Sequence, residues 1–424
     1  MHAGHGHLGG RVMSVLKGMR VVEGSAFVAV PLAGMTLAQM GAEVIRFDRL
    51  GGGLDAGRWP LAPNGESLFW AGMNKGKKSI ALDMKSPQGR ELITRIITAP
   101  GEDAGLFLTN LRVRGWMDHE TLSQHRPDLV MVTLTGDRHG RPQVDYTVNP
   151  ALGIPHMTGP ADSDAPVAHA LPAWDLIAGN MCVSALLAAE RHRLRGHGGQ
   201  EVEIALKDVA AATLGHLGMI GDVTLNTEDR GKSGNALYGA YGQDFVCADG
   251  RRVMVIGLTD RQWRGICKAT GTVEAMTALE QRLGVSLAEE GNRWRVRDDI
   301  TAILKPWFAQ RRVPDFEAAF NDAGLTWSEF RSVREAVELD PDLSTENPIF
   351  SEVMQPGIGR FRVPSHPASF GAAERVDARP APTLGQHTEE ILSNVAGCSS
   401  TEIAQLFDAG IVQSPSFAKP RNAA

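Results

Sequence analysis

The sequence predicts an α/β protein with an open parallel sheet and a second, smaller domain. Short apolar segments alternate with amphipathic helical segments through the N-terminal third of the chain. One of them, 129–134, is almost continuously apolar, which is typical of a parallel strand buried on both faces. The chain has 424 residues. Because a single core stops growing at roughly 250–300 residues, we expect two domains.

The first elements form a βαβ unit. A short apolar strand at 21–22 precedes an amphipathic helix at 31–40, and a second strand follows at 43–48. The same alternation then continues and extends the sheet. It predicts strands at 79–82, 106–109 and 129–134, with a helix at 87–97.

The clearest helix of the sequence is expected at 172–196, followed by a strand at 202–206. Asp175 stands where the N-cap would be, and Gly196 ends the helix. A carboxylate at a helix N-terminus is held ionised by backbone N–H groups and the helix dipole, so Asp175 could act as a nucleophile at neutral pH. Simple capping of the helix is the alternative interpretation.

The C-terminal half does not continue the regular alternation of strands and helices. A glycine-rich passage at 231–242 leads to a strand at 252–257 and to helices that continue to about residue 330, which indicates the second domain. The following section is rich in proline and carries few regular signals until helices at Glu389 and Thr401.

Composition excludes several classes of protein. A formal net charge of −6 gives no positive field for a nucleic acid, so we expect no nucleic-acid partner. No apolar run approaches the roughly 20 residues of a transmembrane helix, and residues 1–12 are expected to form a flexible tail. The four cysteines contain no CxxC pair and no HExxH is present, which predicts no metal site and favours the reducing cytoplasm.

Two places suit phosphate groups. The basic turn at 74–79 precedes a strand, and Arg112 and Arg114 follow the strand that ends near Asn110. A solvated surface turn is the alternative for the first of them. The first βα turn lacks the GxGxxG of dinucleotide-binding proteins, and GxxxxGK[ST] is absent as well, so nicotinamide and ordinary ATP chemistry are disfavoured.

Several segments together resemble one family of proteins, the class III CoA-transferases, also called the CaiB/BaiF family. The resemblance implies a Rossmann-like large domain built from both ends of the chain, a smaller α+β domain, and a homodimer of two interlocked rings. The expected domains are 13–225 and 226–335, with 336–424 returning to complete the large domain. The segments that carry the resemblance are 16–23, 37–48, 74–83, 175–208 and 384–392.

The resemblance also implies a set of functional residues. Asp175 aligns with the catalytic aspartate of the family. No cofactor is implied beyond the CoA of the acyl-CoA substrate, and neither a metal nor ATP is required. The positions expected to bind CoA are Arg46, Lys77, Asn110 and Arg112, and the candidates for binding the second carboxylate of the substrate are Arg58, Tyr238 and Tyr241.

Segments 51–60, 144–160 and 171–180 resemble family members that act on mesaconyl-CoA (2-methylfumaryl-CoA). They imply intramolecular transfer of CoA to the other carboxyl, giving 3-methylfumaryl-CoA, through an aspartyl anhydride and an aspartyl-CoA thioester. Transfer from a donor such as succinyl-CoA to a free acid is the alternative. An α-methylacyl-CoA racemase is less favoured, because Val144 stands where racemases carry histidine. A non-catalytic CoA-binding protein and a dinucleotide oxidoreductase remain as rivals.

Overall fold

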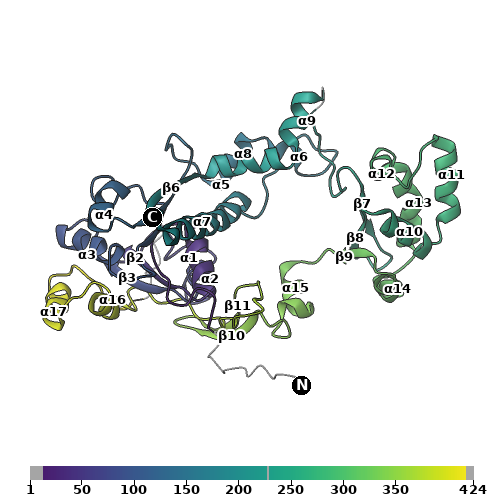
Figure 1. The fold of residues 1–424 in the computed structure, drawn as a ribbon. Coiled ribbons are helices and arrows are strands. Elements are labelled where there is room, and N and C mark those ends of the chain that lie inside the picture. The colour runs from purple at the N-terminus through teal and green to yellow at the C-terminus, as the bar shows by residue number, and fades with distance from the viewer. Residues whose placement is uncertain (1–12, 227–228, 417–424) are drawn as a thin grey trace, which may run out of the picture. The chain divides into compact units, whose positions relative to one another are not determined.

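The computed structural model describes residues 13–226 and 229–416. The expected tail at 1–12 lies outside these ranges. The chain forms two compact units, named here the large unit and the small unit (Figure 1). Of the described residues, the large unit contains those that fall within Met1–Leu152, Ala170–Met219 and Pro341–Ala424, and the small unit contains those that fall within Gly153–His169 and Ile220–Asp340.

A six-stranded parallel sheet forms the centre of the large unit, in the order β3-β2-β1-β4-β5-β6. This is the strand order of a Rossmann fold, and the prediction of an open α/β sheet is confirmed. The switch point, where the connections change direction, lies between β1 and β4. The strands are β1 (Arg20–Gly24), β2 (Glu43–Arg49), β3 (Lys78–Leu82), β4 (Leu106–Thr109), β5 (Val130–Thr135) and β6 (Gln200–Ala205).

Helices cover both faces of this sheet. Their starts follow ordinary capping rules: Ser86, for example, accepts a hydrogen bond from the N–H of Gly89, and Pro87 occupies the first turn of α3. The helices of the large unit are α1 (Ala29–Gln39), α2 (Leu68–Met73), α3 (Pro87–Ile97), α4 (His119–His125), α5 (Asp145–Ala151), α7 (Ala173–His192), α8 (Leu206–His216), α16 (Thr388–Asn394) and α17 (Ser400–Asp408).

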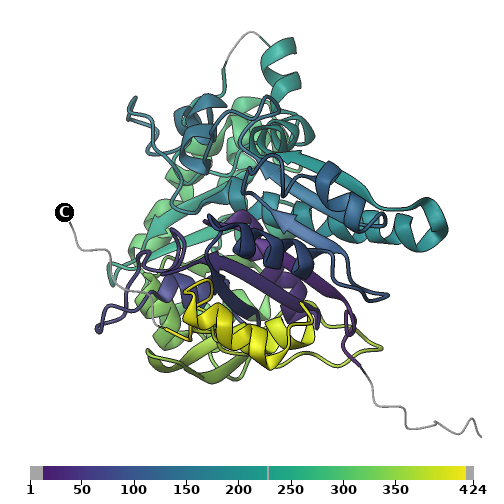
Figure 2. The ribbon, with the colours of Figure 1, turned by 90° about the vertical axis from the view of Figure 1, so that its left-hand side faces the viewer.

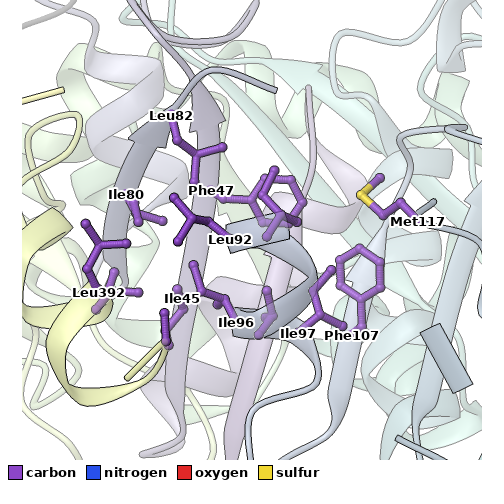
Figure 3. Packing of buried hydrophobic residues seen from close by; sticks show 14 of the residues in the cluster. Ile45, Phe47, Ile80, Leu82, Leu92, Ile96, Ile97, Phe107, Met117 and Leu392 are labelled. Carbon is purple, nitrogen blue, oxygen red and sulfur yellow. The ribbon is translucent and has the colours of Figure 1, made fainter. Parts of the chain in front are cut away.

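The main core of the large unit joins both ends of the chain. Leu92 and Ile96 of α3 pack on Ile45 and Ile80 of the sheet, and Leu392 of α16 belongs to the same buried cluster (Figure 3). Figure 2 shows the C-terminal helices, in yellow, beside the N-terminal strands, in purple. Each fully buried Leu or Ile contributes roughly 1.5–3 kcal/mol, so the returning C-terminal segment stabilises the sheet.

On another side of the sheet, α1 packs directly against α7. A Cβ placed on Gly179 of α7 would lie 2.7 Å from the carbonyl oxygen of Ala29 in α1, so only glycine permits this approach. Asp175 lies one helical turn before Gly179. Because α1 follows β1, this packing fixes the start of α7 relative to the central strands.

The C-terminal segment contains a hairpin that sequence analysis missed. β10 (Phe350–Gln355) pairs with β11 (Gly359–Pro364) in antiparallel fashion. The prolines that suggested irregular structure lie at its boundaries: Pro356 follows β10, and Pro364 is the last residue of β11. Proline at the edge of a ladder costs no central hydrogen bond.

The small unit has an α+β fold, as expected. Its three-stranded antiparallel sheet packs on an aromatic core in which the rings of Phe245 and Phe308 stack with centroids 4.2 Å apart. The strands are β7 (Tyr241–Val246), β8 (Arg252–Gly257) and β9 (Thr326–Glu329), and the helices are α6 (Ile154–Met157), α10 (Asp260–Ala269), α11 (Val273–Leu283), α12 (Glu290–Arg295), α13 (Arg297–Ala309), α14 (Glu317–Asp322) and α15 (Val333–Leu339). All but the first residue of α9 (Met219–Leu225) also belong to the small unit.

Candidate active site

Asp175 lies in the first turn of α7 and is half-buried. The prediction that it is the N-cap is wrong, because α7 begins at Ala173 and its N-cap position is Pro172. Asp145 at the start of α5 does the capping instead. Its Oδ2 accepts hydrogen bonds from the backbone N–H of Trp174 at 2.8 Å and of Asp175 at 3.3 Å.

The environment of Asp175 makes its carboxylate basic. Burial, together with the nearby charge of Asp145, raises the pKa of Asp175 to about 6, although the charge of Arg58 opposes the shift. Two of the helix N–H donors that were expected to hold this carboxylate ionised are directed to Asp145 instead. Asp175 is still mostly ionised at neutral pH, and a basic carboxylate is the better nucleophile.

This pKa has a consequence for stability. The carboxyl titrates near 3.8 when unperturbed and about 6 in the folded protein, so the folded state binds the proton more tightly. As pH rises through that interval the folded protein must hold a buried charge and loses stability. Asp175→Asn should thus melt at a higher temperature than the wild type near pH 8, and the difference should vanish near pH 4. An equal difference at both pH values would contradict the raised pKa.

A rigid loop follows β1 at the switch point of the sheet. Asn110, just after β4, donates its Nδ2 to the carbonyl of Ala26 at 2.8 Å and accepts the N–H of Ala26 at 2.9 Å. The N–H of Phe27 donates to Asp55 Oδ1 at 2.7 Å. Phe27 has φ of 68°, a left-handed conformation that non-glycine residues adopt only when their surroundings impose it. Ligands of open α/β sheets bind at this place.

Arg58 is exposed and is held over aromatic rings. Its Cζ lies 5.4 Å from the ring centroid of Phe27 and 5.1 Å from that of Phe69. Its positive charge also acts on Asp175. The structure thus brings two residues predicted from the sequence, Arg58 and Asp175, within electrostatic range of each other.

The two candidate tyrosines belong to the small unit. Tyr241 is fully buried, and its hydroxyl forms a hydrogen bond with Thr301 at 3.1 Å, so it has the surroundings of a core residue. Tyr238 is 45% exposed, and Arg230 Cζ lies 3.4 Å from its ring centroid. Contact of either tyrosine with a substrate stays a prediction.

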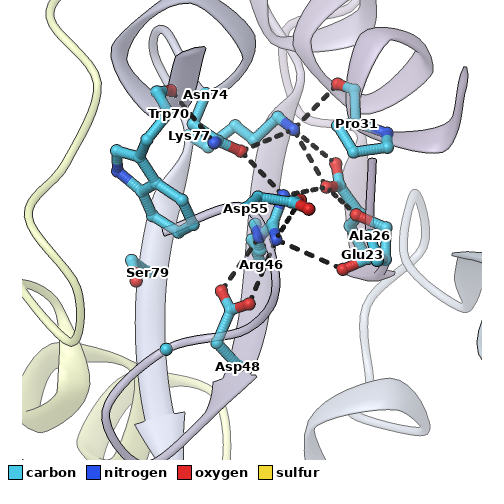
Figure 4. A network of polar contacts seen from close by, with 12 residues as sticks. Glu23, Ala26, Pro31, Arg46, Asp48, Asp55, Trp70, Asn74, Lys77 and Ser79 are labelled. Carbon is cyan, nitrogen blue, oxygen red and sulfur yellow. Dashed lines mark hydrogen bonds and ion pairs between the residues drawn. The ribbon is translucent and has the colours of Figure 1, made fainter. Parts of the chain in front are cut away.

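Arg46 and Lys77 lie together in a buried network that is drawn in Figure 4. Arg46 pairs with Asp48 at 2.9 Å and with Asp55 at 3.0 Å, whereas Lys77 pairs with Glu23 at 2.8 Å. Only 1% of Arg46 and 3% of Lys77 are exposed. These cations hold the ends of β1 and β2 through groups of the chain itself, and their direct contact with CoA stays a prediction.

Arg112 differs from Arg46 and Lys77 because it is exposed after β4. Its Nη1 donates to the carbonyl oxygen of Gly140 at 3.0 Å, which joins the loops that follow β4 and β5. Three more exposed arginines lie on these same loops, at positions 114, 138 and 141, and Arg141 is paired with the buried Asp137 at 2.6 Å. This edge of the sheet therefore carries a concentration of positive charge suited to phosphate.

Sequence analysis missed the support of Asp175 by α5. Besides the cap from Asp145, Asn149 Oδ1 accepts the indole N–H of Trp174 at 3.1 Å. Both α5 residues are buried. Because α5 and the start of α7 are far apart in sequence, no local sequence pattern predicts that they contact each other. The available signal was an aspartate and an asparagine on successive turns of one short helix.

Two further observations concern the described ranges alone. Over 13–226 and 229–416, no group of three or more His, Cys, Asp or Glu side chains is arranged to hold a metal ion. Within the same ranges, no helix has the length and apolar character needed to cross a membrane.

The large unit combines a Rossmann-like sheet with a basic carboxylate in the first turn of α7, and comparison with known proteins gives the family. The model of CoA-transferase family III matches residues 16–388. The chain belongs to this family and is an enzyme of the CoA-transferase/isomerase type.

Individual relatives differ in similarity. The 2-methylfumaryl-CoA isomerase of Chloroflexus aurantiacus is 55% identical over 95% of this chain and 98% of its own. The succinyl-CoA:glutarate CoA-transferase of Mus musculus is 25% identical over 95% of this chain and 91% of its own. Among solved structures, a CaiB/BaiF family protein from Brucella suis matches with a TM-score of 0.74 and 23% identity, covering 90% of this chain and 100% of that one. This last likeness supports the fold.

Proposed function

We propose that the enzyme isomerises 2-methylfumaryl-CoA (mesaconyl-CoA) to 3-methylfumaryl-CoA by moving CoA between the two carboxyls of one C5 dicarboxylate. The similarity to the Chloroflexus isomerase carries this proposal. Its 55% identity extends over almost the whole of both chains, whereas the mouse succinyl-CoA:glutarate CoA-transferase shares 25%. The basic carboxylate of Asp175 supplies a nucleophile for the same chemistry.

In the proposed mechanism, an Asp175 carboxylate oxygen attacks the thioester carbonyl and expels CoA thiolate, which leaves a mixed anhydride. The thiolate then attacks the carbonyl carbon of Asp175, which frees the substrate carboxylate and forms an aspartyl-CoA thioester. The free acid turns, and its other carboxylate attacks this thioester to form a second anhydride. Attack of the thiolate on the substrate carbonyl completes the isomer and restores Asp175. Covalent capture divides the exchange into easier steps.

Binding roles follow from charge and exposure. We propose that Arg58, held over two aromatic rings near Asp175, binds the distal carboxylate of the substrate. Arg112 and the exposed arginines on the loops after β4 and β5 suit the phosphates of CoA. Arg46, Lys77 and Asn110 would support the site through the contacts described above.

We also propose that the enzyme needs no cofactor beyond the CoA of its substrate and acts as an interlocked homodimer in the cytoplasm. Large apolar side chains are highly exposed in the single chain, among them Leu225 at 85% and Val333 at 82%. A second copy would cover such surfaces. The four cysteines are free thiols, which suits a reducing compartment.

The test is to incubate the purified enzyme with mesaconyl-CoA as the single substrate, with isotopically labelled free mesaconate present in a parallel reaction. We expect a regioisomer of unchanged mass that takes up no label, because the freed acid never leaves the site. Chromatography and mass spectrometry measure both quantities.

Two other outcomes would contradict the proposal. Label in the product would mean that free acid exchanges with the bound acid. No reaction until a different acid or a succinyl-CoA donor is added would establish intermolecular transfer instead.

A further inference from the structure

The inference concerns the carboxylate behind Asp175 and rests on the proposed function, in which Asp175 is the nucleophile. Asp145 is 1% exposed, so it has little access to solvent or substrate. Its Oδ2 accepts both the N–H of Trp174 and that of Asp175. These are two of the donors that a helix N-terminus leaves without partners inside the helix.

The arrangement removes stabilisation that Asp175 would otherwise receive. A carboxylate in the first turn of a helix normally gains from the free N–H groups and the positive end of the helix dipole. Here a second, buried carboxylate accepts those N–H groups. The charged groups that act on the Asp175 carboxyl are Asp145 from α5, which opposes its ionisation, and Arg58 from the loop after β2, which favours it.

The contact is also built for rigidity. Asn149, one helical turn after Asp145, accepts the indole N–H of Trp174 and is 0% exposed. α5 therefore holds the start of α7 by two sets of hydrogen bonds. Asp145 accepts backbone N–H groups at Asp175 and the residue before it, and Asn149 accepts the side-chain N–H of Trp174. Of these two contacts, only that of Asp145 includes the nucleophilic residue Asp175.

We propose that Asp145 is a positioning residue, which fixes the first turn of α7 by accepting its N–H groups and keeps Asp175 a basic, poorly solvated nucleophile by placing a negative charge beside it. An ordinary N-cap would only stabilise the helix. Asp145 acts on the reaction through Asp175 and touches neither CoA nor the acyl group.

Two substitutions separate its two effects. Asp145→Asn keeps an oxygen for the two N–H groups and removes the negative charge, so the acid limb of the kcat/KM profile should move to lower pH by about one unit. Asp145→Ala removes the cap as well, and the loss of position should lower kcat by about 100-fold with little change in KM.

The matched control is Asn149→Leu, which removes the hydrogen bond between Asn149 and the indole of Trp174 and leaves the Asp145 cap in place. We expect its pH profile to keep the acid limb of the wild type. If Asp145 were merely structural, its two variants and Asn149→Leu would lose activity together, with unshifted profiles, and the proposal would be overturned.

The profiles are measured on the intact enzyme with mesaconyl-CoA, and thermal melts confirm folding of each variant. A failure of the proposed function gives a different result: the wild type itself would not turn over this substrate, or Asp175→Ala would remain active. In that event both the proposed function and the positioning role of Asp145 are wrong. An active wild type with an unshifted pH profile for Asp145→Asn would contradict the positioning role of Asp145 alone.

Discussion

Replacing Asp175 by alanine should abolish turnover, with a loss in kcat of about 10⁴-fold or more, because no other group would capture the acyl carbon. The loss should come without unfolding. Alanine removes a half-buried carboxylate whose ionised form the fold opposes, as its raised pKa shows. Thermal melts near pH 8 should therefore give a variant at least as stable as the wild type.

Asp164→Ala is a suitable control, since this aspartate is exposed in the small unit. It should leave kcat unchanged. Retention of activity in a folded Asp175→Ala variant would contradict the role of Asp175 as nucleophile and leave it as only part of a helix start. Absence of turnover in the wild type would instead support the rival interpretation, a non-catalytic CoA-binding protein.

Arg46→Ala should be strongly destabilising, by about 3–5 kcal/mol, because its removal leaves buried carboxylates without their cation. Arg46 contacts Asp48 and Asp55 directly, and Glu23 lies 3.6 Å away. All four side chains are almost completely buried. Urea unfolding followed by circular dichroism measures the change in free energy.

Arg20→Ala provides the comparison. The Arg20–Glu43 pair also links the ends of β1 and β2, but its two side chains are 26% and 30% exposed, so we expect a loss of at most about 1 kcal/mol. This pair of variants also separates two roles for Arg46. If Arg46→Ala kept wild-type stability and only raised KM for acyl-CoA, direct contact with CoA would be its function.

Much of the large unit could be predicted from sequence because its signals are local. The apolar run of β5 predicts a strand, and the alternation of apolar and polar residues around α3 predicts a helix, each from a few neighbouring residues. The hairpin β10–β11 is not predicted from sequence, because Pro356 and Pro364 at the ends of its strands indicate irregular structure. Proline is compatible with the end of a strand, so its presence does not exclude a β-ladder beside it.

The candidate site was predictable only in part. Asp175 could be selected from its helix and from the family resemblance, but its electrostatics depend on Asp145, which another helix supplies. The family resemblance implies that Arg46 and Lys77 contact CoA. Their carboxylate partners come from several segments, so burial of the network is a property of tertiary packing that sequence spacing does not carry.

The most direct test of covalent transfer through Asp175 follows oxygen atoms. Mesaconyl-CoA carrying heavy oxygen in its free carboxylate is mixed with excess enzyme for a single turnover, and the peptide containing Asp175 is then weighed by mass spectrometry. When that carboxylate attacks the aspartyl thioester, one of its oxygens passes to Asp175, so the account predicts a peptide heavier by one oxygen replacement and a product that keeps the other heavy oxygen. An unlabelled Asp175 peptide beside fully labelled isomer would contradict it.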